Sequence, residues 1–253
     1  MLIVVPVSKS DEPLMQSFVN CFNLFGPYYN DSLLVVGRES DGRYIDFVFD
    51  NIKNNFQLCH SNVTSFSNVY DGWPLGPNSY WKQTILYLEK NNNTLPWIWM
   101  EMDVCPLKPG WSTSLSADYC IRNKPFYGTL GDTNTITLDD ELVYLTKHLV
   151  GAGIYPHNIS KYSNNWKFVD RIKTAFDVVC QFEIAPLSYH SELFQHNFRT
   201  INYRKTDSDL IICDNQTYYR GGRKFNDDVR DGAVVLHGCK DTSLYDIIYS
   251  TYK

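Results

Sequence analysis

The chain has 253 residues, a length that fits one large domain or two small ones and allows a substantial buried core. Hydrophobic residues make up 43% and charged residues 20%, a balance that argues against a disordered chain. The formal net charge of −5 argues against nucleic-acid binding by the surface as a whole, although it is compatible with a local basic patch.

The seven cysteines indicate a reducing compartment. No two of them are spaced as CxxC and their number is odd, so neither a zinc ribbon nor a disulfide scaffold is expected. The apolar run at the N-terminus is broken by Pro6 and lacks a basic region, unlike a signal peptide. No run approaches the roughly 18 apolar residues that span a bilayer. We therefore expect a soluble protein with no membrane contact, located in the cytoplasm, or in the host cytoplasm if the source is viral.

The first part of the chain predicts a strand, a helix and a second strand. Apolar runs at 2–7 and 32–37 indicate strands, and the segment 10–26 between them has helical spacing. Pro13 suits the first turn of that helix. This β–α–β opening favours an α/β fold with parallel strands. A third short strand is predicted at 44–50.

Two carboxylates follow the most apolar strand of the chain. An amphipathic helix at 78–90 leads into an apolar run at 97–100, and Glu101 and Asp103 come directly after that run. Because side chains on a strand alternate between faces, these two carboxylates are predicted to point the same way. A bound cation would compensate their repulsion. Ligands of open α/β sheets gather beyond the carboxyl ends of strands, so this strand end is a candidate site.

The second half predicts further helices and a late strand. Thr137 and Asp140 resemble a capping box for a helix at 139–150, and 167–184 also has a helical pattern. An apolar strand at 233–236 then ends in a histidine and a glycine turn before a final helix. Because no repeat or linker is visible, one domain over residues 1–253 is expected.

The residues at the two strand ends suggest phosphate chemistry. Glu101 and Asp103 offer hard oxygen ligands and His237 offers a nitrogen, a set that suits Mn²⁺, or less well Mg²⁺. Lys240 follows the histidine across a glycine turn and is placed to meet phosphate oxygens. A divalent cation and a lysine together can stabilise the negative charge of a diphosphate leaving group.

The same segments resemble those of a known superfamily. The segment WIWMEMDVCPLKPGW (97–111) resembles the DxD segment of GT-A type glycosyltransferases, which holds the metal of a nucleotide-diphosphate sugar. LHGCKDTSL (236–244) is similar to the late histidine segment that completes that metal site, and IVVPVSKSD (3–11) is similar to the first strand and loop that hold the base and ribose. More narrowly, the chain resembles small phage-type enzymes of this fold, some of which are grouped with enzymes that add sugars to hydroxymethylated bases in DNA.

The resemblance implies a single α/β GT-A domain, Rossmann-like, with a mixed, mostly parallel central sheet flanked by helices. Residues 1–110 would bind the nucleotide sugar, and 111–253 would form the acceptor part and carry the late histidine. Such an enzyme is a hexosyl- or pentosyltransferase that uses Mn²⁺ or Mg²⁺. Glu101 stands where the family has Asp, so it would act through the ribose, through a water or on the metal. The implied donor-binding residues are Val5, Ser8, Asp11, Glu101 and Lys240, and the implied metal ligands are Asp103, His237 and Glu101.

The acceptor side has several candidates. Asp177 and Glu183 lie in an otherwise apolar stretch, where a partly buried carboxylate would serve as general base toward an acceptor hydroxyl, although both also fit ordinary helix-surface charges. His190 and His196 are further candidates. The segment 151–158 reads either as a loop over the sugar or as a helix stop and turn.

Two basic, aromatic stretches at 197–205 and 218–224 suggest a nucleic-acid acceptor. Such stretches can follow a phosphate backbone and receive a flipped base, although they also fit solvated loops. We favour DNA containing hydroxymethylated pyrimidines, with a glycan or small molecule as the alternative acceptor. A nucleotidyltransferase of related fold and a non-catalytic sugar- or DNA-binding protein are the competing functions, the former disfavoured because PVSKSDEP lacks the glycines of a triphosphate loop. The basic residues are Arg199, Arg204, Lys205, Arg220, Arg223 and Lys224.

Overall fold

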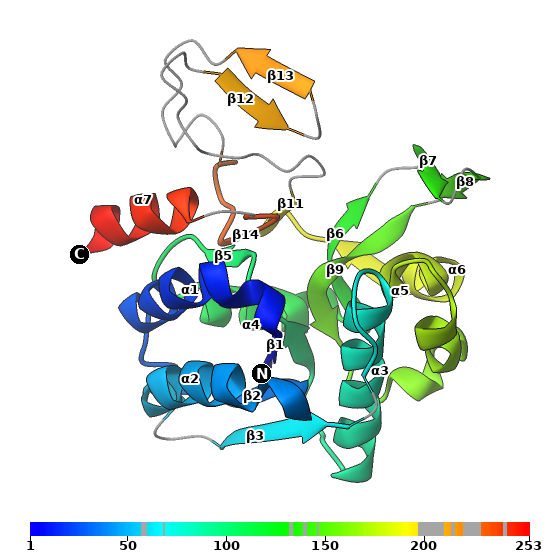
Figure 1. Ribbon diagram of the computed structural model, residues 1–253, viewed down its shortest axis with the longest axis horizontal. Coiled ribbons are helices and arrows are strands. Elements are labelled where there is room, and N and C mark those ends of the chain that lie inside the picture. Colours follow the sequence, from blue (N-terminus) through cyan, green and yellow to red (C-terminus); the bar gives the residue numbers. More distant parts are fainter. Residues whose placement is uncertain are drawn as a thin grey trace.

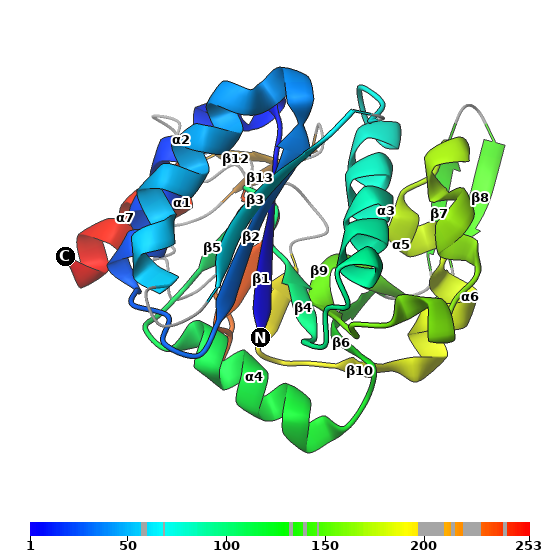
Figure 2. The ribbon, with the colours of Figure 1, turned by 90° about the horizontal axis from the view of Figure 1, so that it is seen from below.

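The computed structural model describes residues 1–56, 60–67, 69–131, 134–138, 141–145, 147–196, 210–213, 216–219, 229–239 and 242–253. Figure 1 gives an overall view of the chain. Its centre is a seven-stranded sheet in the order β10–β6–β9–β4–β1–β2–β3, whose strands are labelled in Figure 2. Within this sheet β9 is antiparallel to β4 and β6, and all other neighbours are parallel. The predicted mixed, mostly parallel sheet is confirmed. Its strands are β1 (Leu2–Val7), β2 (Ser32–Arg38), β3 (Ser61–Phe66), β4 (Trp97–Trp99), β6 (Phe126–Gly131), β9 (His148–Tyr155) and β10 (Ser188–His190).

Helices cover both faces of the sheet (Figure 2). In β1, Ile3 and Val5 belong to one buried cluster and Leu2 and Val4 to the other, because successive side chains point to opposite faces. A strand buried on both faces reads as a continuous apolar run, as this one does. The first cluster includes side chains of α1 (Glu12–Leu24), α2 (Gly42–Ile52), α4 (Trp111–Arg122) and α7 (Ser243–Tyr252), and the second those of α3 (Leu75–Lys90), α5 (Phe176–Val179) and α6 (Gln181–Ile184).

The β1–α1–β2 unit confirms the predicted opening, but the predicted third strand is wrong. Residues 44–50 lie inside helix α2. Their buried positions, Tyr44, Ile45 and Val48, follow helical spacing, which a short apolar window does not separate from strand alternation. The third strand, β3, comes later in the chain and pairs with β2.

The predicted helix at 139–150 is also wrong. Residues 141–145 form β8 (Glu141–Leu145), which pairs with β7 (Asn134–Leu138), and β9 begins at His148. Every residue of β9 is buried between β4 and β6, so its sequence lacks the alternation of apolar and polar residues that would identify a strand. Asp140 of the predicted capping box lies outside the described residues.

The predicted helix at 167–184 is interrupted. Its first residues belong to a 3₁₀ segment, Asn165–Arg171, and the rest forms the two short helices α5 and α6. Segment 151–158, predicted as a loop or turn, is mostly strand, since β9 runs to Tyr155.

A second, three-stranded sheet lies beside the end of β4 and completes the frame of the site. Its order is β11–β14–β5, with β5 (Val104–Pro106), β11 (Phe194–His196) and β14 (Val235–His237). A separate antiparallel pair joins β12 (Leu210–Cys213) and β13 (Gln216–Tyr219). Among the described residues, no helix combines the length and apolar character needed to cross a membrane.

Candidate functional site

The two carboxylates are brought together by a turn. Strand β4 ends at Trp99, and the Val104 N–H donates to the Glu101 carbonyl oxygen at 2.9 Å, which closes a tight turn over residues 101–104. Glu101 and Asp103 therefore do not lie on a strand, and the expected alternation of strand side chains is not what brings them together. The turn reverses the chain into β5 and leaves both carboxylates beyond the carboxyl end of β4, as predicted.

Strand β14 delivers the histidine to this turn. β14 and β5 are antiparallel, with His237 opposite Val104. Beyond the histidine, the N–H groups of Gly238 and Cys239 donate to the Asp103 carbonyl oxygen at 3.0 and 2.9 Å. Gly238 has a φ of 102°, a left-handed conformation that glycine adopts without strain. These backbone bonds fix the histidine turn against the acidic turn.

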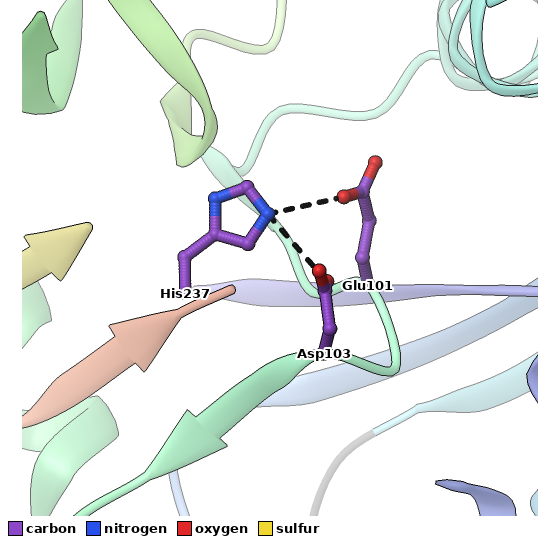
Figure 3. Close-up of side chains that lie close together, drawn as sticks. All are labelled: Glu101, Asp103 and His237. Carbon is purple, nitrogen blue, oxygen red and sulfur yellow. Dashed lines mark ion pairs between the residues drawn. The ribbon is translucent and has the colours of Figure 1, made fainter. Parts of the chain in front are cut away.

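Glu101, Asp103 and His237 face one another (Figure 3). The Nε2 atom of His237 lies 3.3 Å from Glu101 Oε2 and 3.5 Å from Asp103 Oδ1. One ligand atom from each residue fits within 4.8 Å of the others. The Asp103 side chain is 7% exposed and that of His237 is 12% exposed, so water screens this cluster poorly. The sequence prediction that these three residues meet agrees with the structure.

The electrostatics of the cluster suit a cation. Burial acts to lower the pKa of His237, but the Asp103 and Glu101 carboxylates outweigh it and raise that pKa to about 10. The imidazole therefore holds a proton between the carboxylates at neutral pH, in the place where a divalent cation would balance both charges. Trp99 Nε1 also donates to Glu101 Oε1 at 3.0 Å and orients that carboxylate. Two carboxylates and one imidazole are a donor set that fits Mn²⁺ or Mg²⁺.

A cavity of about 1070 Å³ opens beside the cluster. It lies across the carboxyl ends of β1, β2 and β4. The chain adds β2 on one side of β1 and β4 on the other, so the strand order changes direction at this point of the sheet. The segment before α3, the first half of β9 and the start of α5 form further walls. Glu101, Asp103 and His237 line this cavity, so the cluster is accessible to a ligand of substantial size.

Ser8 and Asp11, predicted to bind the donor, also line the cavity. The backbone N–H and hydroxyl of Ser8 donate to Asp11 Oδ2 at 2.8 and 3.0 Å. Burial raises the pKa of Asp11 to about 6, against the lowering effect of these hydrogen bonds. Val5 is fully buried in β1, where its neighbours Pro6 and Val7 line the cavity instead. Lys240 lies outside the described residues.

Arg38 is a cavity residue that the sequence reasoning missed. It ends β2, and its guanidinium contacts Asp71 and lies 3.2 Å from Asp41 Oδ2. The signal was present in the sequence, because Arg38 follows an apolar strand at its carboxyl end just as Glu101 does. At the end of the cavity formed by β1 and β2, its positive charge is paired with these two carboxylates.

The two predicted general bases have different surroundings. Asp177 lies in the first turn of α5 and lines the cavity; its Oδ2 accepts from the Gly151 N–H at 3.2 Å and its Oδ1 from the Val178 N–H at 2.9 Å. Burial raises the pKa of Asp177, and nearby His148, a second missed cavity residue, opposes that rise. Glu183 does not line the cavity: its carboxylate accepts from the backbone N–H groups of residues 164 and 165, each at 3.1 Å.

The two further histidine candidates are also separated. His190 Nδ1 accepts from the Leu130 N–H at 3.0 Å, and its Nε2 lies 3.4 Å from Glu192, away from the cavity lining. His196 lines the cavity, and its Nδ1 lies 2.9 Å from His237 Nδ1. The basic residues predicted to bind DNA all lie within 197–209 and 220–228, outside the described residues.

Comparison with known proteins identifies the fold. No protein-family model matches the chain, and no curated protein sequence matches it either. Among solved structures, the galactosyltransferase LgtC, in complex with donor and acceptor sugar analogues, matches with a TM-score of 0.53 at 10% identity, over 99% of this chain and 96% of that one. The chain has a GT-A fold.

Two further glycosyltransferases share this GT-A fold. Mouse xyloside xylosyltransferase 1 matches with a TM-score of 0.51 at 10% identity, over 94% of this chain and 96% of that one. The bifunctional glycosyltransferase WbbM matches with a TM-score of 0.57 at 7% identity, over 99% of this chain and 49% of that one. At these identities the likeness concerns the fold, and residue roles rest on the geometry of this GT-A chain itself.

Proposed function

We propose that the chain is a metal-dependent glycosyltransferase that moves a sugar from a nucleotide-diphosphate sugar to an acceptor hydroxyl. The observation that carries the proposal is the Glu101–Asp103–His237 cluster, which lies at the end of β4 and opens into a cavity of about 1070 Å³. Small-molecule sites typically occupy about 300–1,000 Å³, so this cavity accommodates a large ligand. The GT-A fold shared with glycosyltransferases of known structure supports the same reaction class.

The donor would lie across the sheet from β2 to β4. Arg38, paired with Asp41 and Asp71, lines one end of the cavity beside Ser8 and Asp11, whose polar groups would bind a ribose or base. Glu101, Asp103 and His237 would hold Mn²⁺ or Mg²⁺ at the other end. A cation bound there would stabilise the charge that develops on the diphosphate as its bond to the sugar breaks. Lys240, four residues after Leu236, remains a proposed partner of the same diphosphate.

Asp177 is the proposed general base toward the acceptor. It lines the cavity, and its raised pKa, caused first by burial, favours uptake of a proton more than an exposed carboxylate would. Its two backbone hydrogen bonds hold the carboxylate in one orientation. Glu183 is not carried into this proposal, because its hydrogen bonds tie it to residues 164 and 165 instead of the cavity.

For the acceptor we propose a hydroxymethylated pyrimidine in DNA, on the strength of the basic and aromatic sequence at 197–205 and 218–224. The test incubates the protein with a donor that it binds, Mn²⁺ and DNA containing hydroxymethylcytosine or hydroxymethyluracil, and then weighs the digested nucleosides. A hexose or pentose mass on the modified base supports the proposal. No added mass, with donor hydrolysis intact, assigns the acceptor to a glycan or small molecule.

The donor proposal is tested with a panel of nucleotide-diphosphate sugars. Thermal stabilisation and hydrolysis of each are measured with and without Mn²⁺. One donor that stabilises the protein only with the metal, and that is hydrolysed only then, supports the proposed function. Stabilisation by nucleoside triphosphates in place of nucleotide sugars would contradict it and favour a nucleotidyltransferase.

A further inference from the structure

His196 and His237 are paired across two strands. β11 and β14 are parallel, and the Cα atoms of His196 and His237 are direct partners in their register. The two rings lie with centroids 4.5 Å apart and planes inclined by 55°, and their Nδ1 atoms are 2.9 Å apart. This separation is that of a hydrogen bond between ring nitrogens. One ring must therefore donate and the other accept.

The direction of this bond follows from the other edge of His237. Its Nε2 faces Glu101 Oε2 and Asp103 Oδ1 at 3.3 and 3.5 Å. A metal ligand must present a lone pair, so a neutral His237 that binds a cation through Nε2 carries its hydrogen on Nδ1. That hydrogen points at Nδ1 of His196, which then accepts. The second nitrogen of a metal-binding histidine usually donates to such a partner, and the partner fixes the tautomer and the ring orientation.

We infer that His196 is a positioning residue for the metal site: it accepts the Nδ1 hydrogen of His237 and so keeps Nε2 directed at the cation. This inference rests on the proposed metal-dependent function. It assigns His196 to the metal end of the cavity and away from the role of an acceptor base.

The strand that carries His196 has a second support besides its pairing with β14. Arg230 donates from Nη2 to the carbonyl oxygens of Glu192 and Phe194 at 2.9 and 2.6 Å, and its backbone N–H donates to Gln195 Oε1 at 2.8 Å. Arg230 Nη1 also pairs with the Glu192 carboxylate at 2.6 Å. Arg230 thus holds the backbone at Glu192 and Phe194 and the side chain of Gln195, which supports the strand that presents His196, as a positioning residue requires.

The test measures Mn²⁺ affinity of the full chain by the electron paramagnetic resonance signal of free Mn²⁺. His196→Phe keeps a ring but removes the acceptor, and it should weaken Mn²⁺ binding by about 10- to 100-fold, the usual cost of losing such a partner. His196→Asn places an amide oxygen close to the former Nδ1 and should restore most of the affinity. His190→Phe, a histidine outside the cavity, is the matched control and should bind Mn²⁺ as the wild type does.

If His196→Phe binds Mn²⁺ as tightly as the wild type does, the inference is overturned. It is also overturned if His196→Phe and His196→Asn weaken Mn²⁺ binding equally, since the amide of Asn would not rescue a residue that acts in folding alone. A wild type that binds no Mn²⁺ or Mg²⁺ overturns the proposed metal dependence, and the inference with it. Circular dichroism and urea unfolding check each variant. If His196→Phe does not fold, His196→Leu removes the same acceptor with a smaller side chain.

Discussion

Two aspartates, the buried Asp103 and the half-buried Asp177, line one cavity, and their neighbours give them different chemistry. Asp103 shares a cluster with Glu101 and His237, whose ligand atoms lie within 4.8 Å of one another. Asp177 instead accepts hydrogen bonds from the backbone N–H groups of Gly151 and Val178, and burial raises its pKa. The first arrangement suits the proposed cation, whereas the second suits the proposed general base. The surroundings of each aspartate, and not the residue type, separate the two roles.

The two sites are also supported differently. The turn that carries Asp103 is fixed through its backbone by residues from the far end of the chain, including Tyr245, whose hydroxyl donates to the Met102 carbonyl oxygen at 2.6 Å. In the segment that carries Asp177, one side chain makes several of the supporting hydrogen bonds. Asn78 donates to the carbonyl oxygens of Val169 and Thr174 and accepts from the Phe176 N–H, each at 2.8 Å.

Asp103→Asn should abolish turnover and weaken Mn²⁺ binding by more than about 100-fold, since losing an outer partner alone costs 10- to 100-fold. The bonds from Gly238 and Cys239 go to its backbone oxygen, so the fold should survive. Mn²⁺ titration and donor hydrolysis measure both effects, with Asp46→Asn on the exposed face of α2 as control. Metal-dependent activity equal to that of the wild type would remove Asp103 from the site.

Asp177→Asn should lower kcat by about 10²–10⁴, the usual contribution of a general base, with Mn²⁺ affinity unchanged. Because the pKa of Asp177 is raised, wild-type kcat should fall as the pH drops through a value above the ordinary aspartate range, and this fall should be absent from the residual activity of the variant. The kcat–pH profiles of both proteins check the assignment. Loss of Mn²⁺ affinity in the variant would instead show that Asp177 contributes to the metal site.

Asn78→Ala should reduce the free energy of unfolding by about 1–3 kcal/mol, because it leaves buried backbone groups without their partner. It should also lower kcat more than Mn²⁺ affinity, since it loosens the segment of Asp177. Urea unfolding and steady-state kinetics measure the two effects. Asn51→Ala, on the exposed side of α2, is the control, and equal stability of the two variants would argue against the supporting role.

Trp99→Phe should have the smallest effect, a loss of about 0.5–1.5 kcal/mol in Mn²⁺ binding, since it removes one hydrogen bond to Glu101. Trp166→Phe is the control and removes the same side-chain volume from a buried position. The Nε1 of Trp166 has no hydrogen-bond partner among the described residues, so this variant loses no hydrogen bond. Mn²⁺ titration of both variants separates the lost bond from the lost volume. Identical affinities would show that Glu101 needs no orienting donor.

The sequence was sufficient to predict that Glu101, Asp103 and His237 meet, because each of them lies at or just beyond the end of an apolar strand. Glu101 and Asp103 end one apolar strand, and His237 ends another, so the rule for strand ends locates them without a tertiary structure. The same rule, applied to the end of β2, would have located Arg38. The reason given for the pairing of the carboxylates was incorrect, since a turn whose hydrogen bond spans 101–104 is not visible in a strand pattern.

The rest of the cavity could not be read from the sequence, because long-range pairing decides it. His148 reaches the cavity only because residues 148–155 form a strand buried between β4 and β6, where a helix had been predicted. Likewise, the sequence of residues 44–50 fits both a strand and a helix. Only the buried positions in the folded chain show that the spacing is helical. The contact of His196 with His237 depends on the register of β11 and β14, two strands of three residues separated by a long segment.

The backbone bonds between Asp103 and residues 238 and 239 tie the site to the order of synthesis. A ribosome makes the acidic turn long before it makes β14, so the turn waits without its histidine and without the donors to its carbonyl oxygen. A nascent chain stopped before Val235 therefore cannot assemble the cluster. The proposed affinity for a divalent cation should therefore appear only once β14 has left the ribosome and has paired with β5.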